Sequence, residues 1–176
     1  AHLVGKLALK NQVVVVDNFH RNSKQYFSWP KQVKVIEADI TSPETLVQYR
    51  GPVDVVIHLA AIAGVSNYSK MPATTMQVNL LGTANVLGWA RRKQAKLVIN
   101  FSSSEVYGPQ ATDAKENQPT VLGPVGEPRW TYAASKISAE HLCMAYWRQW
   151  QLPAVSLRPF NIYGPGMKIN DYRVIP

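Results

Sequence analysis

Short apolar runs, rich in Val and Ile, alternate along this chain with stretches of helical spacing. The clearest run is Gln-Val-Val-Val-Val at 12–16, whose continuous apolar character is typical of a strand buried on both faces. The other candidate strands lie at 33–37, 54–59, 96–101 and 154–158. Helical stretches are expected at 2–10, from Thr41 or Ser42 to about 50, at 72–93 and at 130–151. This order predicts an α/β fold, a mostly parallel sheet covered by helices on both faces.

The size and composition indicate one globular domain. The 176 residues, 46% of them hydrophobic, are enough to form a core. The apolar runs are too short to cross a bilayer, and the N-terminus has no signal-peptide pattern, so we expect no membrane partner. Cys143 is the only cysteine, which excludes an internal disulfide and favours a reducing, cytoplasmic setting.

The net charge of +8 suits either nucleic acid or small anions such as nucleotide sugars and dinucleotides. The basic residues are scattered. Their densest run, Arg91-Arg92-Lys93, ends a predicted helix, where cations suit the helix dipole. The sequence contains no recognisable nucleic-acid-binding module. We therefore expect a small anionic ligand, no nucleic-acid partner and no metal site.

Tyr132 and Lys136 lie four residues apart, on one face of a predicted helix. An ammonium group beside a phenol favours the phenolate and should lower the pKa of the phenol from about 10. Such a tyrosine can accept the proton of a sugar hydroxyl near neutral pH. That transfer is half of an alcohol oxidation, and the other half, loss of a hydride, needs a cofactor.

Two carboxylates follow predicted strands, where ligands bind in open α/β sheets. Asp17 comes directly after the first strand, where it can hold an adenosine ribose and would repel a 2′-phosphate, which favours NAD over NADP. The alternative is an Asp that starts a turn before Asn18. Asp39 follows the second strand after Glu37-Ala38 and has two interpretations as well, an adenine contact or the start of a turn before Thr41.

These features together resemble the extended short-chain dehydrogenase/reductase superfamily, in its nucleotide-sugar epimerase, dehydratase and decarboxylase branch. The matching motifs run almost from end to end: Val13 to Phe19, Glu37 to Ile40, His58 to Ala61, Val78 to Thr83, Phe101 to Gly108, Tyr132 to Lys136 and Arg158 to Gly166. Their order and spacing carry the resemblance more than any single motif. It implies a Rossmann-like doubly wound fold, NAD as cofactor and a nucleotide-sugar substrate.

The resemblance also implies NAD-binding positions. Asp17 with Asn18 would hold the adenine ribose, and Asp39 with Ile40 the adenine. The segment Leu59-Ala60-Ala61 would pass beside the pyrophosphate and the nicotinamide ribose. The full implied set is Asp17, Asn18, Asp39, Ile40, Leu59, Ala60, Ala61, Tyr132, Lys136 and Pro159.

The implied catalytic residues gather around Tyr132. Ser103 and Tyr132 would bind the reacting hydroxyl of the sugar, and Lys136 would bond the nicotinamide ribose and lower the pKa of Tyr132. Asn161 would lie near the diphosphate of the substrate. The catalytic set is Ser103, Ser104, Glu105, Tyr132 and Lys136, and the substrate-binding set is Ser103, Tyr132 and Asn161.

Glu105 points to the reaction class. Glu after Ser resembles the 4,6-dehydratases and glucuronate decarboxylases more than simple 4-epimerases, because a carboxylate near C5 can act once C4 is oxidised. Ser104 stands where dehydratases often have Asp, and 166–174 resembles UDP-glucuronate decarboxylases. Decarboxylation is therefore slightly favoured, with 4,6-dehydration and 4-epimerisation as alternatives. Glu105 as a purely structural loop carboxylate is the remaining interpretation.

The sequence departs from the family pattern at both ends. The family begins with a strand and a Gly-x-x-Gly-x-x-Gly loop, which binds the pyrophosphate, and continues beyond Pro176 into a smaller domain. We expect 1–176 to form a partial NAD-binding Rossmann domain lacking the first strand, the glycine loop and the C-terminal substrate domain, with 159–176 starting the substrate-binding region. The missing strand should expose apolar edges that a second copy would cover in a homodimer. The competing hypothesis is a catalytically inactive Rossmann module that serves assembly or binding.

Overall fold

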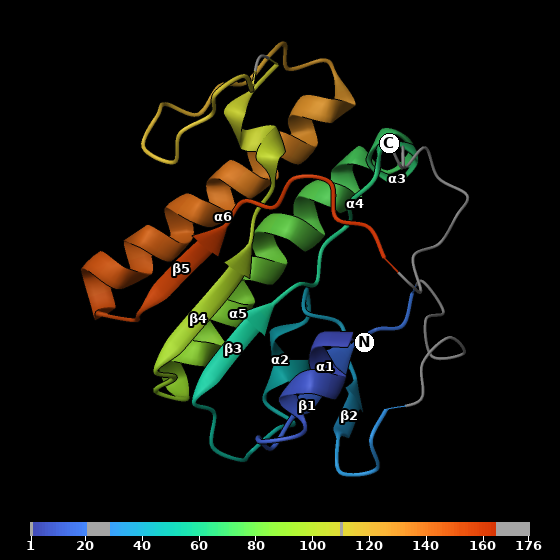
Figure 1. The fold of residues 1–176 in the computed structure, drawn as a ribbon, viewed down its shortest axis with the longest axis vertical. Coiled ribbons are helices and arrows are strands. Elements are labelled where there is room, and N and C mark those ends of the chain that lie inside the picture. Colours follow the sequence, from blue (N-terminus) through green and yellow to red (C-terminus); the bar gives the residue numbers. More distant parts are fainter. Residues whose placement is uncertain (1, 21–28, 110, 165–176) are drawn as a thin grey trace.

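The computed structural model describes residues 2–20, 29–109 and 111–164 (Figure 1). The decarboxylase-like segment at 166–174, and with it most of the predicted start of a substrate-binding region, lies outside the described residues.

The predicted strands are all present, with their ends shifted by one or two residues. They are β1 (Val14–Asp17), β2 (Lys34–Glu37), β3 (Val55–His58), β4 (Leu97–Phe101) and β5 (Ala154–Leu157). Every described pair is parallel, and the register sets Asp17 opposite Glu37 and His58 opposite Asn100. The carboxyl ends of paired strands therefore meet at one edge, the edge where ligands bind in this class of sheet.

The described strands form two parallel sheets. β1 pairs with β2, while β3, β4 and β5 form the second sheet in that order. In Figure 1 the β1–β2 sheet lies to the right of β3, which is the nearer edge strand of the larger sheet. Among the described residues no ladder joins β1 to β3, so a single continuous sheet is not formed by this part of the chain.

The helices follow the strands as predicted, but those expected to reach residue 10 and about residue 50 end at Leu7 and Leu46, and two other differences appear. They are α1 (His2–Leu7), α2 (Pro43–Leu46), α3 (Val65–Lys70), α4 (Pro72–Met76), α5 (Gly82–Arg92) and α6 (Pro128–Trp150). The helix predicted over 72–93 is interrupted by a π-helical turn, η2 (Gln77–Leu81). Two stretches in which no helix or strand was predicted, 60–71 and 102–129, contain α3 and a 3₁₀ turn, η3 (Ser104–Tyr107).

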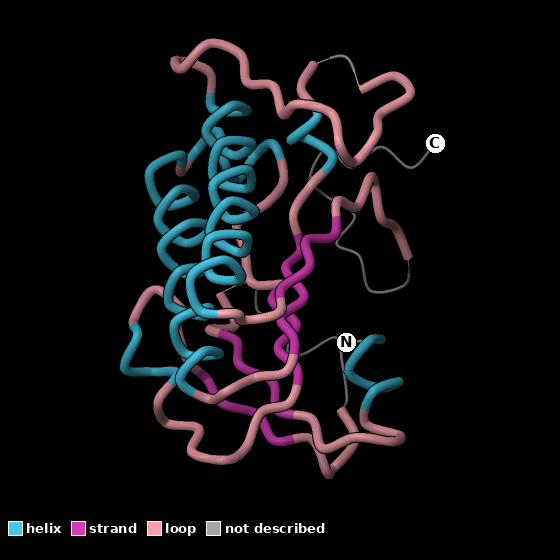
Figure 2. Tube along the Cα trace, turned by 90° about the vertical axis from the view of Figure 1, so that its left-hand side faces the viewer, coloured by secondary structure: helices cyan, strands magenta, loops and turns pink. Residues whose placement is uncertain are grey.

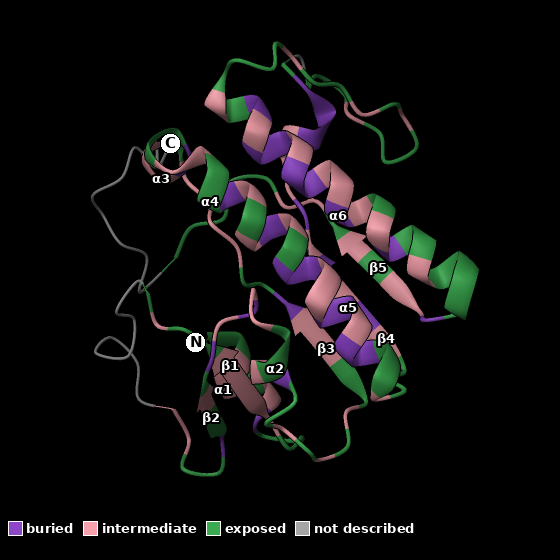
Figure 3. Ribbon diagram, turned by 180° about the vertical axis from the view of Figure 1, so that it is seen from behind, coloured by how far each residue is buried: buried purple, intermediate pink, exposed green. Residues whose placement is uncertain are grey.

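The core lies between the larger sheet and the helices packed on it. One cluster joins α5, β4 and α6 through Leu87, Val98 and Cys143. A second cluster on the other side of α5 contains Val86 and Trp89, and Val16 of β1 and Val56 of β3 both pack against it. Figure 2 shows the long helices on one side of the strands and α1 on the other, and Figure 3 shows the buried stripe along α5 and α6. Helix α5 is therefore shared by both sheets.

The other face of the larger sheet remains open among the described residues. Val155 and Leu157 of β5 are each 43% exposed, and Val55 of β3 is exposed as well. Exposed apolar side chains in alternation are unusual for a strand of a doubly wound sheet, which is normally buried on both faces.

Candidate active site

Helix α6 carries the Tyr132–Lys136 pair on its buried face. The helix starts at Pro128, whose fixed φ suits a first helical position. Tyr132 and Lys136 are both buried. The Lys136 Nζ donates a hydrogen bond to the Phe101 carbonyl at 2.8 Å, at the end of β4. The pair predicted from the sequence is therefore docked against the strand that leads into Ser103.

The pKa of Tyr132 differs from the expectation. Burial raises the pKa of Tyr132, the Ser103 hydroxyl opposes this, and the charge of Glu105 adds to the rise. Burial lowers the pKa of Lys136 to about 8. The expectation that Lys136 lowers the pKa of Tyr132 is not met in this structure, because desolvation of the phenol is the larger effect and Lys136 points its ammonium at the Phe101 carbonyl.

The segment Ser103-Ser104-Glu105 enters the site as the start of η3. Ser103 caps this turn, since its Oγ accepts the Glu105 N–H at 3.2 Å. The Ser104 N–H donates to the Pro159 carbonyl at 3.0 Å, which ties the loop after β4 to the loop after β5. Ser103, Ser104 and Pro159, all predicted site residues, therefore lie together at the strand ends.

Two further residues at this site, Arg129 and Tyr68, lie outside the motifs found in the sequence. Arg129 donates through Nε to Glu105 Oε2 at 2.6 Å. The Tyr68 ring, from α3, stacks on the Tyr132 ring with centroids 5.2 Å apart and planes 18° apart. Arg129 is 24 residues from Glu105 and Tyr68 is 64 from Tyr132, so local spacing contains no signal for either contact.

A second group of predicted residues lies at the ends of β1 and β2. Asp17 Oδ1 accepts the Phe19 N–H at 2.7 Å, and Asp39 Oδ1 accepts the Thr41 N–H at 2.8 Å. Asn18 Nδ2 donates to Asp39 Oδ2 at 2.9 Å, which links the two strand ends. The hydrogen bonds from Thr41 also lower the pKa of Asp39. Both carboxylates therefore start turns, and the ribose contact of Asp17 and the adenine contact of Asp39 stay predictions.

The remaining predicted positions differ in exposure. Leu59 and Ala60, directly after β3, are exposed, and Ala61 is half-buried. Ile40 is buried in the second core cluster, and its carbonyl accepts a hydrogen bond from the Asn85 side chain. Asn161 is exposed beyond β5, next to Phe160, whose ring stacks on Tyr107. An adenine contact by Ile40 stays a prediction, since its side chain serves the core.

The part of the chain that the structure describes has no group of three or more His, Cys, Asp or Glu side chains arranged to hold a metal ion. A search of those same residues finds no helix with the length and apolar character needed to cross a membrane.

Known proteins resemble this chain along its whole length. Residues 1–176 match the NAD dependent epimerase/dehydratase family. A UDP-glucuronic acid decarboxylase 1 of Xenopus tropicalis is 36% identical over 99% of this chain and 41% of its own length. A UDP-N-acetyl-alpha-D-glucosaminuronate decarboxylase of Bacillus cytotoxicus is 35% identical over 100% of this chain and 55% of its own length.

The fold also resembles that of solved structures. The crystal structure of a Thermus thermophilus UDP-glucose 4-epimerase in complex with NAD superposes with a TM-score of 0.83 and 30% identity, over 98% of this chain and 55% of that one. This confirms the predicted Rossmann-like fold. The chain spans about half the length of the relatives it matches. With motifs, fold and whole-length match in agreement, the chain belongs to the NAD dependent epimerase/dehydratase family.

Proposed function

We propose that this chain forms part of an NAD-dependent enzyme that modifies a nucleotide sugar through a 4-keto intermediate, with a UDP-glucuronate-like uronic acid as substrate and decarboxylation as outcome. The observation that carries this proposal is the convergence of Tyr132, Ser103, Lys136 and the Arg129-paired Glu105 at the carboxyl end of β4. The decarboxylases among the relatives support the choice of reaction over 4,6-dehydration and 4-epimerisation.

The residues at the ends of β1 and β3 fit the cofactor. Asp17 and Asn18 are exposed at the end of β1, so acceptors and an amide are available for a ribose diol. The small, exposed Ala60 after β3 leaves room for the backbone of the loop to approach a dinucleotide. NAD, when bound, accepts a hydride from C4 of the sugar and can return it.

Tyr132 is assigned as the base that takes the proton from the C4 hydroxyl, and Ser103 shares that hydrogen bond. Lys136 is assigned to the ribose beside the nicotinamide and to the phenol, which requires its ammonium to leave the Phe101 carbonyl or to bond both groups. Asn161, exposed after β5, is assigned to the diphosphate of the substrate.

Glu105 is assigned to C5. Once C4 is a ketone, the sugar carboxylate is a β-keto acid: the C5–C6 bond breaks, CO₂ leaves, and the electron pair forms the enolate. Glu105, once it has taken up a proton from solvent, can then donate that proton to C5 of the enolate. Arg129 holds Glu105 Oε2 at 2.6 Å, which fixes the direction of the carboxylate beside Tyr132.

The reaction is tested with the full-length protein, NAD and, separately, UDP-glucuronate, dTDP-glucose and UDP-glucose, with products identified by mass. We expect loss of CO₂ from UDP-glucuronate alone. Tyr132→Phe should abolish the transient NADH absorbance, and a Tyr132→Phe variant that still turns over would contradict the assignment. If the product is a dehydrated dTDP-sugar, the reaction is 4,6-dehydration and not decarboxylation. If the product is a 4-epimer, the reaction is 4-epimerisation.

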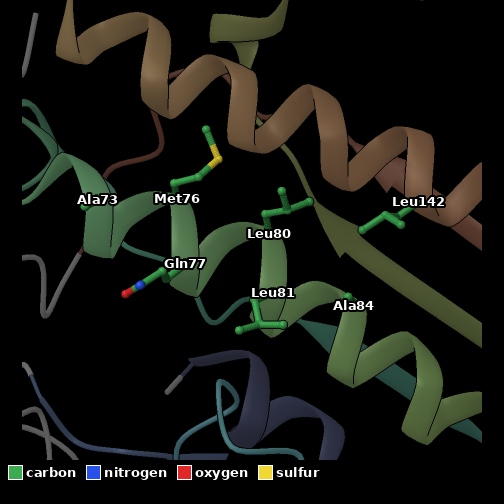
Figure 4. A pocket seen from close by; sticks show the side chains of 7 residues that line it. All are labelled: Ala73, Met76, Gln77, Leu80, Leu81, Ala84 and Leu142. Carbon is green, nitrogen blue, oxygen red and sulfur yellow. The ribbon is translucent and has the colours of Figure 1, made fainter.

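We also propose that the protein is a homodimer whose copies meet at an apolar groove on α4, η2, α5 and α6. Figure 4 shows its lining, which contains no charged residue: Ala73, Met76, Gln77, Leu80, Leu81, Ala84 and Leu142. Because the lining is uncharged and apolar, two copies can meet there without bringing like charges together. The groove shares no residue with the active site, so dimerisation would leave that site open.

A further inference from the structure

A buried path of hydrogen bonds joins the loop after β3 to the catalytic helix α6 and runs through the π-helical turn η2. Its side chains come from His58, Asn79, Thr83 and Ser135, all of them buried. Asn79 and Ser135 are 1% and 0% exposed. Their hydroxyl and amide groups have no place in the chemistry described above.

Asn79 clamps the backbone of Ile62. Its Oδ1 accepts the Ile62 N–H at 2.7 Å, and its Nδ2 donates to the Ile62 carbonyl at 3.0 Å. The same Nδ2 donates its second proton to Ser135 Oγ at 3.1 Å. An amide nitrogen has two protons, so both donors of Asn79 are in use.

Ser135 completes the path to the catalytic residues. Its hydroxyl accepts from Asn79 and donates to the Tyr132 carbonyl at 2.7 Å. Ser135 also directly precedes Lys136. A single hydroxyl thus connects the loop after β3, through Asn79, to the turn of α6 that carries both catalytic side chains. In a buried site each of these bonds is costly to leave unmade, so their lengths restrict the spacing between loop and helix.

A second branch holds the end of β3. Thr83 Oγ1 donates to the Asn79 carbonyl at 2.6 Å and therefore accepts at its other contact, His58 Nε2 at 2.9 Å. This assigns the proton of His58 to Nε2. Asn79 lies in the π-turn, where its side chain contacts Ile62 and Ser135 and its carbonyl accepts from Thr83, and such turns are frequent at functional sites.

We propose that Ser135 is a positioning residue, whose hydroxyl sets the spacing between loop 59–63 and the Tyr132–Lys136 pair. The loop is the part of the chain assigned to the cofactor and the pair acts on the sugar, so the proposal rests on the proposed function for its catalytic consequence. Its structural consequence, an ordered Ile62 backbone, does not depend on that function.

The test compares Ser135→Ala with Ser138→Ala in the full-length protein. Ser138 lies three residues later on α6, is half-buried, and is outside the path from Asn79 to Tyr132. For Ser135→Ala we expect amide hydrogen exchange at Ile62 to accelerate and NAD to bind about tenfold more weakly, the scale of one buried hydrogen bond. We expect kcat to fall while the KM for the sugar changes little. Ser138→Ala should match the wild type in all of these.

Ser135→Cys keeps nearly the same shape with a weaker donor and should give intermediate exchange and affinity. If Ser135→Ala folds poorly, Ser135→Cys replaces it in the exchange and affinity measurements. A Ser135→Ala protein with a lower Tm but wild-type exchange at Ile62 and wild-type NAD affinity would reduce Ser135 to a structural role and overturn the proposal. If the wild type modifies none of the sugars, the proposed function fails, while exchange and NAD affinity still decide the role of Ser135.

Discussion

Arg129 and Glu105 form an ion pair that is partly open to solvent, with side chains 44% and 30% exposed. Exposed pairs contribute little to stability, about 0–1 kcal/mol, so a role of this pair should appear in catalysis. We expect Arg129→Ala in the full-length protein to lower kcat about tenfold or more, the usual scale for loss of an oriented acid–base group, with little change in Tm.

Arg148→Ala is the matched control, since Arg148 lies in the last turn of the same helix α6. Steady-state kinetics of both variants measures kcat, and thermal unfolding measures Tm. We expect only Arg129→Ala to lower kcat. An unchanged kcat in Arg129→Ala would show that Glu105 does not depend on its partner, or has no catalytic role.

His58 gives the fold a dependence on pH. Burial, with the charge of Lys136, lowers the pKa of His58 from 6.5 to about 4. Between these values the unfolded chain binds a proton that the folded chain does not, so stability falls as the pH drops below 6.5. The loss between pH 7 and pH 5 should be about 2 kcal/mol.

His58→Gln keeps a donor for Thr83 and removes the titration, so its stability should be flatter over the same range. Urea unfolding at pH 7 and pH 5 measures this, with the exposed His141→Gln as control. If His58→Gln loses as much stability as the wild type between the two pH values, another group is responsible.

Helix α5 contains two glycines in different surroundings. A Cβ on Gly82 would lie 2.5 Å from Ile40 Cδ1 and 2.8 Å from its Cγ1, inside the second core cluster. A Cβ on Gly88 would meet only ordinary contacts, at 3.5 Å from the Tyr146 hydroxyl and 3.6 Å from an Arg92 nitrogen.

We expect Gly88→Ala to stabilise the protein by roughly 0.5–1 kcal/mol through helix propensity. Gly82→Ala should destabilise it by about 1–3 kcal/mol, because Ile40 must move within a packed core. Denaturant unfolding of both variants tests this, and equal stabilisation by the two changes would show that Ile40 moves aside at no cost.

The strands were predictable from the sequence, because runs such as Val13 to Val16 are apolar over consecutive residues and need no distant information. The pair Tyr132 and Lys136 was predictable for the same reason, since four residues span one helical turn. The π-turn η2 was not, and the contacts of its Asn79 are with Ile62 and Ser135, residues 17 and 56 positions away. The raised pKa of Tyr132 was not predictable either, since it depends on burial in the folded chain, where the ring of the distant Tyr68 stacks on it.

At the scale of the whole molecule, the proposed dimer is tested at Leu81, which is 48% exposed in the apolar groove. We expect the full-length wild type to sediment as a dimer and Leu81→Lys as a monomer, because a buried, unpaired ammonium weakens association by several kcal/mol. Leu9→Lys, at an exposed position outside the groove, should remain a dimer. A monomeric wild type, or a dimeric Leu81→Lys, would contradict the proposed interface.

The separation of β1 from β3 has a consequence for how the domain loses its structure. In the described residues the two sheets share packing on α5 and no ladder, so side-chain contacts alone couple them. For residues 1–176 taken alone, we therefore expect amide protection in β1 and β2 to be lost at lower urea than in β3, β4 and β5. A strand placed between β1 and β3 would join the two sheets and remove this difference.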